Sequence, residues 1–294
     1  MNGIPYILVL LAAMLWGTTG TAQNFISGEA HPLTIGAFRL MIGGFSLLLF
    51  TLVTKSIIFR SIPWRAAFLS AVSMALFQPL FFSSVQLTGI AIGTVVAIGS
   101  APVLAGMIEW LFLKKRPDRI WTMATIMAII GCILLFANKG AADVNSLGVA
   151  MALGAGLAFA LYAIVSKNVL ASMEAVPAVA LIFSVAAVFL MPSLFFFDIS
   201  YIRIPENVGI ILYLGIATTS LAYILFSKGL KKIPSSAAVT LSLAEPLTAS
   251  ILGVLIVGEE LSVLSWAGIA LLLGGILVLT MGGKRKAEEN YELS

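Results

Sequence analysis

The chain has 294 residues, of which 60% are hydrophobic and only 10% are charged. A soluble domain carries about 25% charged residues, so much of this apolar surface must face lipid. The net charge of +4 does not indicate nucleic-acid binding, because the basic residues fall in short loops between apolar runs. The composition leaves no room for a catalytic or nucleic-acid-binding domain outside the membrane. It predicts an all-α integral membrane protein.

Apolar runs that are long enough to cross a bilayer as helices occur ten times along the chain. The first run lacks a basic segment and a cleavage site, so we interpret it as a retained helix. The join between the third and fourth runs, Thr88-Gly89, is very short, and a re-entrant pair is the competing interpretation there. The predicted helices span residues 5–25, 33–53, 64–87, 90–113, 120–137, 147–166, 176–197, 208–227, 235–257 and 262–282.

The loops between these helices carry strongly unequal charge. If both termini are cytoplasmic, fourteen of the 17 Lys and Arg residues lie on the inner side, and only Lys139 and Arg203 lie on the outer side. Basic residues accumulate in cytoplasmic loops, so the sequence predicts a multi-pass protein of the plasma (inner) membrane with both termini inside.

The chain contains two copies of one unit. At a shift of 144 positions, Val95 matches Val239, Pro102 matches Pro246 and Leu111 matches Leu255. The first five-helix repeat covers residues 5–139 and the second covers residues 147–282. A short linker around residues 140–146 joins them, and a polar cytoplasmic tail, expected to be disordered, covers residues 283–294.

Five helices per copy is an odd number, so the two copies must cross the membrane in opposite directions. Inverted repeats of this kind meet at a substrate site near the midplane in transporters, and rocking between them gives alternating access. The fold expected from the sequence is therefore ten transmembrane helices arranged as two inverted five-helix repeats.

Several motifs carry a family resemblance across nearly the whole chain. They are Trp16-Gly17 in the first helix, Arg39 in the second, and the paired segments APV…KKRP and EPL…GEEL. With two five-helix copies, these features resemble the EamA branch of the drug/metabolite transporter (DMT) superfamily. The resemblance implies a central cavity and the export of small metabolites, often amino acids or related compounds. It does not give the substrate.

Glu245 is the sharpest candidate for a functional residue. It is the only formal charge in residues 237–257, and it lies about ten residues from the nearer end, roughly 15 Å deep at 1.5 Å per residue. Low dielectric at that depth disfavours the charged form. The next residue, Pro246, has no N–H to offer the carbonyl of Ser242, which predicts a helix break beside the acid. We expect Glu245 to exchange protons or to pair with a cationic substrate, and a purely structural acid is the alternative.

Three further polar side chains are candidates for substrate binding or coupling. Arg39 would attract a carboxylate or counter a buried acid, unless it snorkels to the outer interface. Gln78, beside the helix break at Pro79, would face a cavity or bond to another helix. Glu109 would line the inner mouth of the cavity or pair with Lys114 or Arg116.

Three aromatic residues, Trp16, Tyr162 and Tyr223, would line a cavity for an apolar or aromatic solute, with packing as the alternative. A third helix break is predicted at Pro102, the counterpart of Pro246.

The chain has one histidine and one cysteine and contains no HExxH, GxSxG, P-loop or CxxC motif. These observations argue against an enzyme and an ATP-driven pump, and no cofactor, metal or nucleic acid is expected. The sequence predicts a secondary transporter that exports small organic metabolites such as amino acids. Its partners would be the solute, the lipid bilayer and either protons or an exchanged solute. The sequence is also compatible with a homo-oligomer. The alternatives are a sugar or nucleotide-sugar carrier of the same superfamily, and a non-transporting membrane scaffold or lipid flippase.

Overall fold

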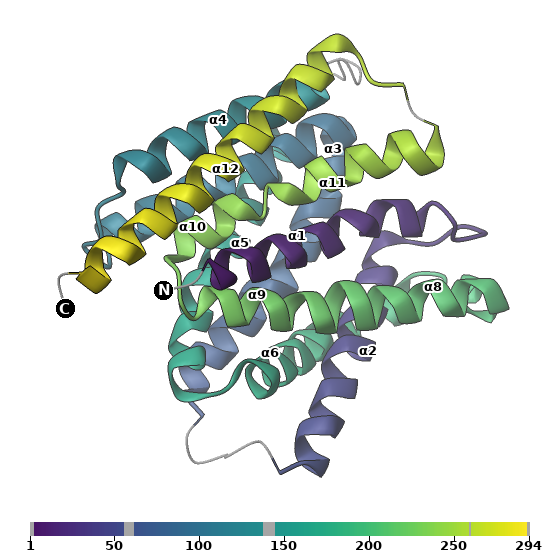
Figure 1. Cartoon of the computed structure of the whole chain (residues 1–294). Coiled ribbons are helices and arrows are strands. Elements are labelled where there is room, and N and C mark those ends of the chain that lie inside the picture. Colours follow the sequence, from purple (N-terminus) through teal and green to yellow (C-terminus); the bar gives the residue numbers. More distant parts are fainter. Residues whose placement is uncertain (1–2, 56–61, 138–144, 259, 293–294) are drawn as a thin grey trace.

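The structure is a computed structural model that describes residues 3–55, 62–137, 145–258 and 260–292. In these ranges every regular element is a helix, and the helices form one bundle (Figure 1). The predicted linker falls largely on residues 138–144, outside the described residues. The elements in the first part of the chain are α1 (Ile4–Gln23), α2 (Pro32–Val53), α3 (Trp64–Leu111), α4 (Arg119–Phe136), α5 (Ser146–Ser172), α6 (Ala175–Leu190), α7 (Ser193–Phe196) and the 3-10 helix η2 (Ser200–Arg203). They are followed by α8 (Pro205–Gly215), the π-helical turn η3 (Ile216–Leu221), α9 (Ala222–Leu230), α10 (Ser235–Leu241), α11 (Ala244–Leu252), the π-helical turn η4 (Gly253–Val257) and α12 (Val263–Glu292).

Among the described residues, nine helical stretches are long and apolar enough to cross a membrane. A shorter apolar helix, Arg119–Leu135, is the fifth of the ten helices that the sequence predicts. Two of the nine stretches belong to α3, which is interrupted at Gly89, where φ is +82°. Glycine adopts this backbone conformation at low cost, so the chain changes direction there without a longer loop. The very short join between the third and fourth predicted helices is therefore present.

Three helix ends differ from the prediction by more than three residues. Helix α6 ends at Leu190 instead of Phe197, before the separate short helix α7. Helix α5 continues to Ser172, six residues beyond the expected end at Ser166. Helix α12 continues to Glu292 instead of ending at Gly282, so the expectation of a disordered tail is wrong. The tail sequence KRKAEE consists of strong helix formers, which extend a helix that has already been nucleated in the membrane. Polarity alone was a poor guide to this segment.

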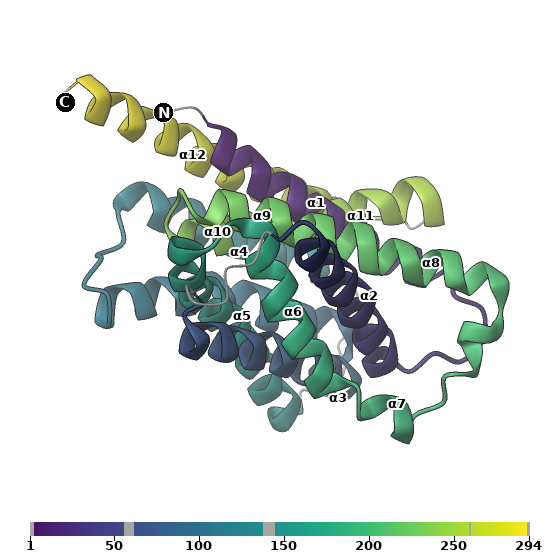
Figure 2. The same ribbon diagram turned by 90° about the horizontal axis from the view of Figure 1, so that it is seen from below.

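Helices from the two halves of the chain pair with one another. Helix α2 packs along α6, α4 along α12, and α3 along α5, while α1 packs along α9 and α11. The α4–α12 pair is in backbone contact, because a Cβ on Gly268 would lie 2.6 Å from the carbonyl oxygen of Gly131. Small residues allow such close approach between helices in lipid. Both views place the start of α1 and the end of α12 at the same end of the bundle (Figures 1 and 2).

The opposite end of the bundle is fastened by polar contacts at the ends of the spans. The Asn207 amide accepts a hydrogen bond from the N–H of Ser27 at 2.9 Å and donates to the Ser27 carbonyl at 2.8 Å. Nearby, Ser200 donates its hydroxyl and its N–H to Asp198, and these bonds hold the pKa of that carboxyl below its usual value. The connection between α1 and α2 is thus held against the start of α8.

Candidate functional site

The predicted break in the ninth span lies beside Glu245. Helix α10 ends at Leu241 and α11 begins at Ala244, which places Glu245 in the first turn of α11. Because Pro246 has no N–H, the carbonyl of Ser242 lacks its helical donor. That carbonyl accepts the N–H of Glu245 instead, at 2.9 Å. The break therefore places Glu245 at the start of a new helix, and the Ser242 carbonyl still accepts a hydrogen bond.

Arg39 on α2 does not extend along its own helix toward the interface. Its guanidinium reaches across to η3, where Nη2 donates to Thr218 Oγ1 at 3.2 Å and Nε donates to Thr219 Oγ1 at 3.4 Å. Snorkelling, the alternative reading of this residue, is therefore not what the structure shows.

The two threonines were missed by sequence reasoning, and the local backbone explains their position. They lie in the π-helical turn η3, and both hydroxyls donate to the carbonyl oxygen of Leu214, at 2.8 Å from Thr218 and 2.9 Å from Thr219. Single π-helical turns often occur at functional sites. The only signal in the sequence was the polar run Thr-Thr-Ser at positions 218–220 inside an apolar span.

Arg39 on α2 and Glu245 on α11 are a basic and an acidic side chain that interact electrostatically, and Tyr223 on α9 interacts with both. Both side chains are half-buried and lie within membrane-spanning helices. An arginine has five N–H donors, so the two contacts to threonine leave further donors for a ligand. The arrangement can bind a carboxylate at Arg39 and a cationic group at Glu245.

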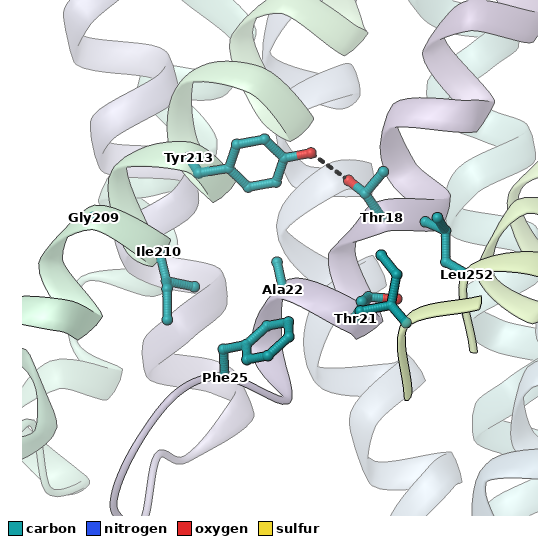
Figure 3. Close-up of a pocket in the computed structure, with 9 residues that line it drawn as sticks. Thr18, Thr21, Ala22, Phe25, Gly209, Ile210, Tyr213 and Leu252 are labelled. Atoms are coloured by element: carbon teal, nitrogen blue, oxygen red, sulfur yellow. Dashed lines mark hydrogen bonds between the residues drawn. The ribbon is translucent and has the colours of Figure 1, made fainter. Parts of the chain in front are cut away.

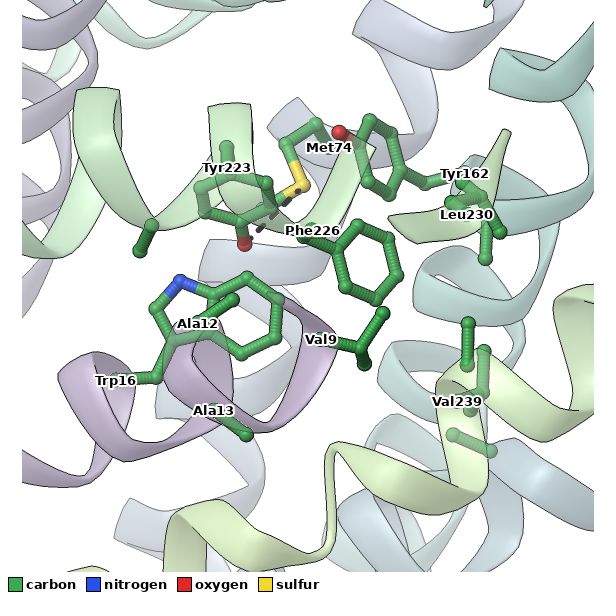
Figure 4. Close-up of a cluster of buried hydrophobic side chains, with 14 of the residues drawn as sticks. Val9, Ala12, Ala13, Trp16, Met74, Tyr162, Tyr223, Phe226, Leu230 and Val239 are labelled. Atoms are coloured by element: carbon green, nitrogen blue, oxygen red, sulfur yellow. Dashed lines mark hydrogen bonds between the residues drawn. The ribbon is translucent and has the colours of Figure 1, made fainter. Parts of the chain in front are cut away.

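The predicted aromatic residues Trp16, Tyr162 and Tyr223 lie together in one buried cluster (Figure 4). The ring centroids of Trp16 and Tyr223 are 4.7 Å apart, and those of Tyr162 and Tyr223 are 5.8 Å apart. Within the described part of the chain, the Tyr223 hydroxyl has one acceptor, Met74 Sδ at 3.9 Å, and a thioether sulfur accepts weakly. The indole N–H of Trp16 has no acceptor among the described residues, although the side chain is 5% exposed. The cluster thus offers hydrogen-bond donors as well as an apolar surface.

The other predicted residues occupy α3, and they do not form one group. Gln78 is buried and packs on α2, with its Oε1 at 3.3 Å from the position of a Cβ on Gly36. Pro79 and Pro102 lie inside α3, and the non-helical residue of that helix is Gly89. Neither proline interrupts α3, so the helix breaks predicted at these two positions are absent.

Glu109 makes neither of the contacts that the sequence suggested. Its carboxylate accepts the N–H of Ser235 at 2.8 Å and both the N–H (3.2 Å) and the hydroxyl of Ser236, at the start of α10. The expected pairing with Lys114 or Arg116 is replaced by this contact, in which the first amide N–H groups of α10, which have no acceptor within their own helix, bind the buried carboxylate.

A separate pocket of about 450 Å³ lies among the ends of α1, α8 and η4 (Figure 3). The hydroxyls of Thr18 and Tyr213 are 2.7 Å apart at its wall. On α1, Thr18 follows the exposed residues Leu11 and Met14 at helical spacing, so this pocket opens on the lipid-facing side. The pocket contains none of the predicted site residues, and we do not assign it to the charged site.

Comparison with known proteins gives the family of the chain. The model of the EamA-like transporter family matches twice, at residues 3–137 and 146–281. The chain is 49% identical to "Uncharacterized transporter YwfM" of Bacillus subtilis (strain 168), over 100% of both chains. It is 28% identical to "Threonine/homoserine exporter RhtA" of Escherichia coli (strain K12), over 95% of this chain and 90% of that protein.

A solved structure titled "Crystal structure of protein" superposes with a TM-score of 0.83 at 20% identity, over 97% of this chain and 99% of the other. At this identity the likeness shows the fold. Both halves of the chain match the family model, and the chain belongs to the EamA-like transporter family of multi-pass membrane proteins.

Proposed function

We propose that the chain is a secondary transporter of the plasma membrane that exports small zwitterionic metabolites such as amino acids. The observation that carries this proposal is the pair Arg39 and Glu245, a basic and an acidic side chain that interact electrostatically and are half-buried inside the membrane-spanning bundle. Ionisable residues within spans are costly and mark substrate or proton pathways. An amino acid presents a carboxylate and an ammonium group to such a pair.

The rest of the proposed site supports a solute of this class. Thr218 and Thr219 hold the Arg39 guanidinium, which leaves it ready to bind a carboxylate in a bidentate manner. Trp16 and Tyr223 would contact the remainder of the solute. The name of the exporter RhtA, which is 28% identical to this chain, makes threonine and homoserine the first solutes to test.

Alternating access follows from the repeat that we propose. The two matches to the family model and the pairing of α2 with α6 and of α4 with α12 support two five-helix units. With both termini cytoplasmic, as the loop charges favour, the units are inverted and the site lies where they meet. The driving force is a proton gradient or exchange with a second solute.

The test is counterflow of labelled threonine and homoserine in proteoliposomes that contain the full chain, with Glu245→Gln as the variant. Glutamine keeps the size of the side chain but removes its charge. If Glu245 holds the ammonium group, the variant should bind the solute more weakly by about 2–5 kcal/mol, the cost of removing one partner from a desolvated charge pair. Each 1.4 kcal/mol is tenfold in affinity, so the concentration for half-maximal counterflow should rise at least tenfold.

The matched control is Glu206→Gln, since Glu206 is an exposed acid in the first turn of α8. It should leave counterflow unchanged. If Glu245 instead carries protons, Glu245→Gln should abolish pH-driven transport while exchange at equal pH persists. Wild-type counterflow and pH dependence in Glu245→Gln would end the case for this residue, and selective counterflow of a sugar or nucleotide sugar would favour the other carrier class.

A further inference from the structure

Glu109 is a buried carboxylate that the proposed transport site does not use. Its side chain lies near the end of α3 and is 4% exposed. The hydrogen bonds that it accepts come from Ser235 and Ser236, the first two residues of α10. A buried carboxylate is tolerated only when donors replace its water, and the start of α10 supplies them.

A second contact at the same place involves α5. The ammonium group of Lys167 donates to the carbonyl oxygen of Ile233 at 2.5 Å, two residues before α10 begins. Lys167 also interacts electrostatically with Glu109. The carboxylate, the ammonium group and the start of α10 therefore form one joint, and each charged member would regain water if the joint opened.

The joint lies where α10 meets two helices of the long α3–α5 pair. Helix α3 packs most extensively along α5, and α10 packs against both of them, whereas α11 packs mainly along α1. The joint lies at the end of the bundle where α1 begins, because the carbonyl oxygen of Pro5 lies 2.5 Å from the position of a Cβ on Gly229, just before α10. At the other end of this span, η4 packs against α11 and α1.

The internal repeat makes this joint one-sided. A shift of 144 positions places Gly253, the first residue of η4, at the position that corresponds to Glu109. Glycine has no side chain that accepts a hydrogen bond. The opposite end of the bundle therefore cannot form the same joint by symmetry.

We propose that the joint between Glu109 and the start of α10 is the latch of a gate at the end of the bundle where both termini lie. In this structure the latch is closed. It must open before the site is exposed at that end, and its one-sidedness biases the transporter toward the state closed there. The inference rests on alternating access as proposed above, but its test requires no solute.

The test measures how fast a buried thiol becomes accessible. The reporter is Ala105→Cys in a Cys132→Ser background, because Ala105 is 0% exposed and lies one helical turn before Glu109 on α3. Full-length protein in oriented vesicles is treated with a membrane-impermeant maleimide from either face. The latch variant is Glu109→Gln, whose amide nitrogen cannot accept a bond from Ser236. The matched control is Glu174→Gln, in which an 85% exposed acid loses its ion pair with Lys231 (3.2 Å).

We expect Glu109→Gln to raise the labelling rate at position 105 at least about tenfold from the terminus-bearing face only, the ratio that corresponds to losing one charge-assisted hydrogen bond. Glu174→Gln should label as slowly as the parent. An unchanged rate in Glu109→Gln, or an equal rise from both faces, would overturn the latch. If Glu109→Gln does not fold, Ser236→Ala is the second variant, because it removes only the hydroxyl donor. It should raise the labelling rate a few-fold, and an unchanged rate in Ser236→Ala would also overturn the latch. Failed counterflow together with one-sided labelling would refute the proposed substrate and leave the latch standing.

Discussion

Gly17 lies where α1 touches the backbone beside Glu245, and replacing it with alanine tests that contact directly. A Cβ at this position would lie 2.6 Å from Thr248 Cβ and 2.7 Å from the carbonyl oxygen of Glu245. Neither atom can turn away, since one is a branched Cβ and the other is backbone. Added volume in a packed interior costs about 1–3 kcal/mol, and we expect Gly17→Ala at the upper end of that range.

The control is Gly20→Ala in the same helix, because a Cβ at Gly20 has no heavy atom within 4 Å. Alanine is the better helix former, so this variant should be neutral or slightly stabilised. Thermal unfolding of both purified variants is the assay. For a chain of this size, 1–3 kcal/mol corresponds to a fall of about 2–10 °C in Tm for Gly17→Ala. Equal Tm values for Gly17→Ala and Gly20→Ala would refute the close contact between α1 and α11.

Two further predictions concern the substrate site. The double substitution of Thr218→Val and Thr219→Val removes both hydroxyl partners of Arg39 while keeping the branched shape, so the KM of counterflow should rise about 10- to 100-fold. Thr125→Val, which removes a hydroxyl bonded elsewhere, is the control, and an unchanged KM in the double variant would contradict the role of the threonines. Trp16→Phe keeps an aromatic ring but lacks the indole N–H, so it should fold normally and raise the KM by about 5- to 30-fold if that donor binds solute. Wild-type kinetics in this variant would assign Trp16 to packing alone.

The sequence was sufficient for features that depend on neighbouring residues. Apolar run lengths gave the spans, and the Thr88-Gly89 join marked the change of direction in α3, because a positive φ is favourable for glycine. The break near Pro246 followed from a missing N–H. The prediction was wrong for the tail, where helix propensity outweighed polarity.

Contacts between distant parts of the chain could not be predicted in the same way. Glu109 bonds to residues 126 and 127 positions away, and nearer lysine and arginine residues were the more obvious partners. Arg39 bonds to hydroxyls 179 and 180 positions away, which are presented by a π-helical turn that periodicity does not reveal. Such partners are set by how helices pack, so they depend on the fold as a whole.

The π-helical turn η3 also determines which way the following helix faces. A π-helical turn accommodates one residue more than an α-helical turn, and each residue of an α-helix accounts for about 100° of rotation. Every side chain after Leu221 is therefore rotated relative to the side chains of α8 by that amount. In this rotated register Tyr223 and Phe226 contact Trp16, at centroid distances of 4.7 and 5.3 Å. The extra residue in the turn thus affects two parts of the site. It positions the threonine hydroxyls that bind Arg39, and it determines the direction in which Tyr223 and Phe226 point.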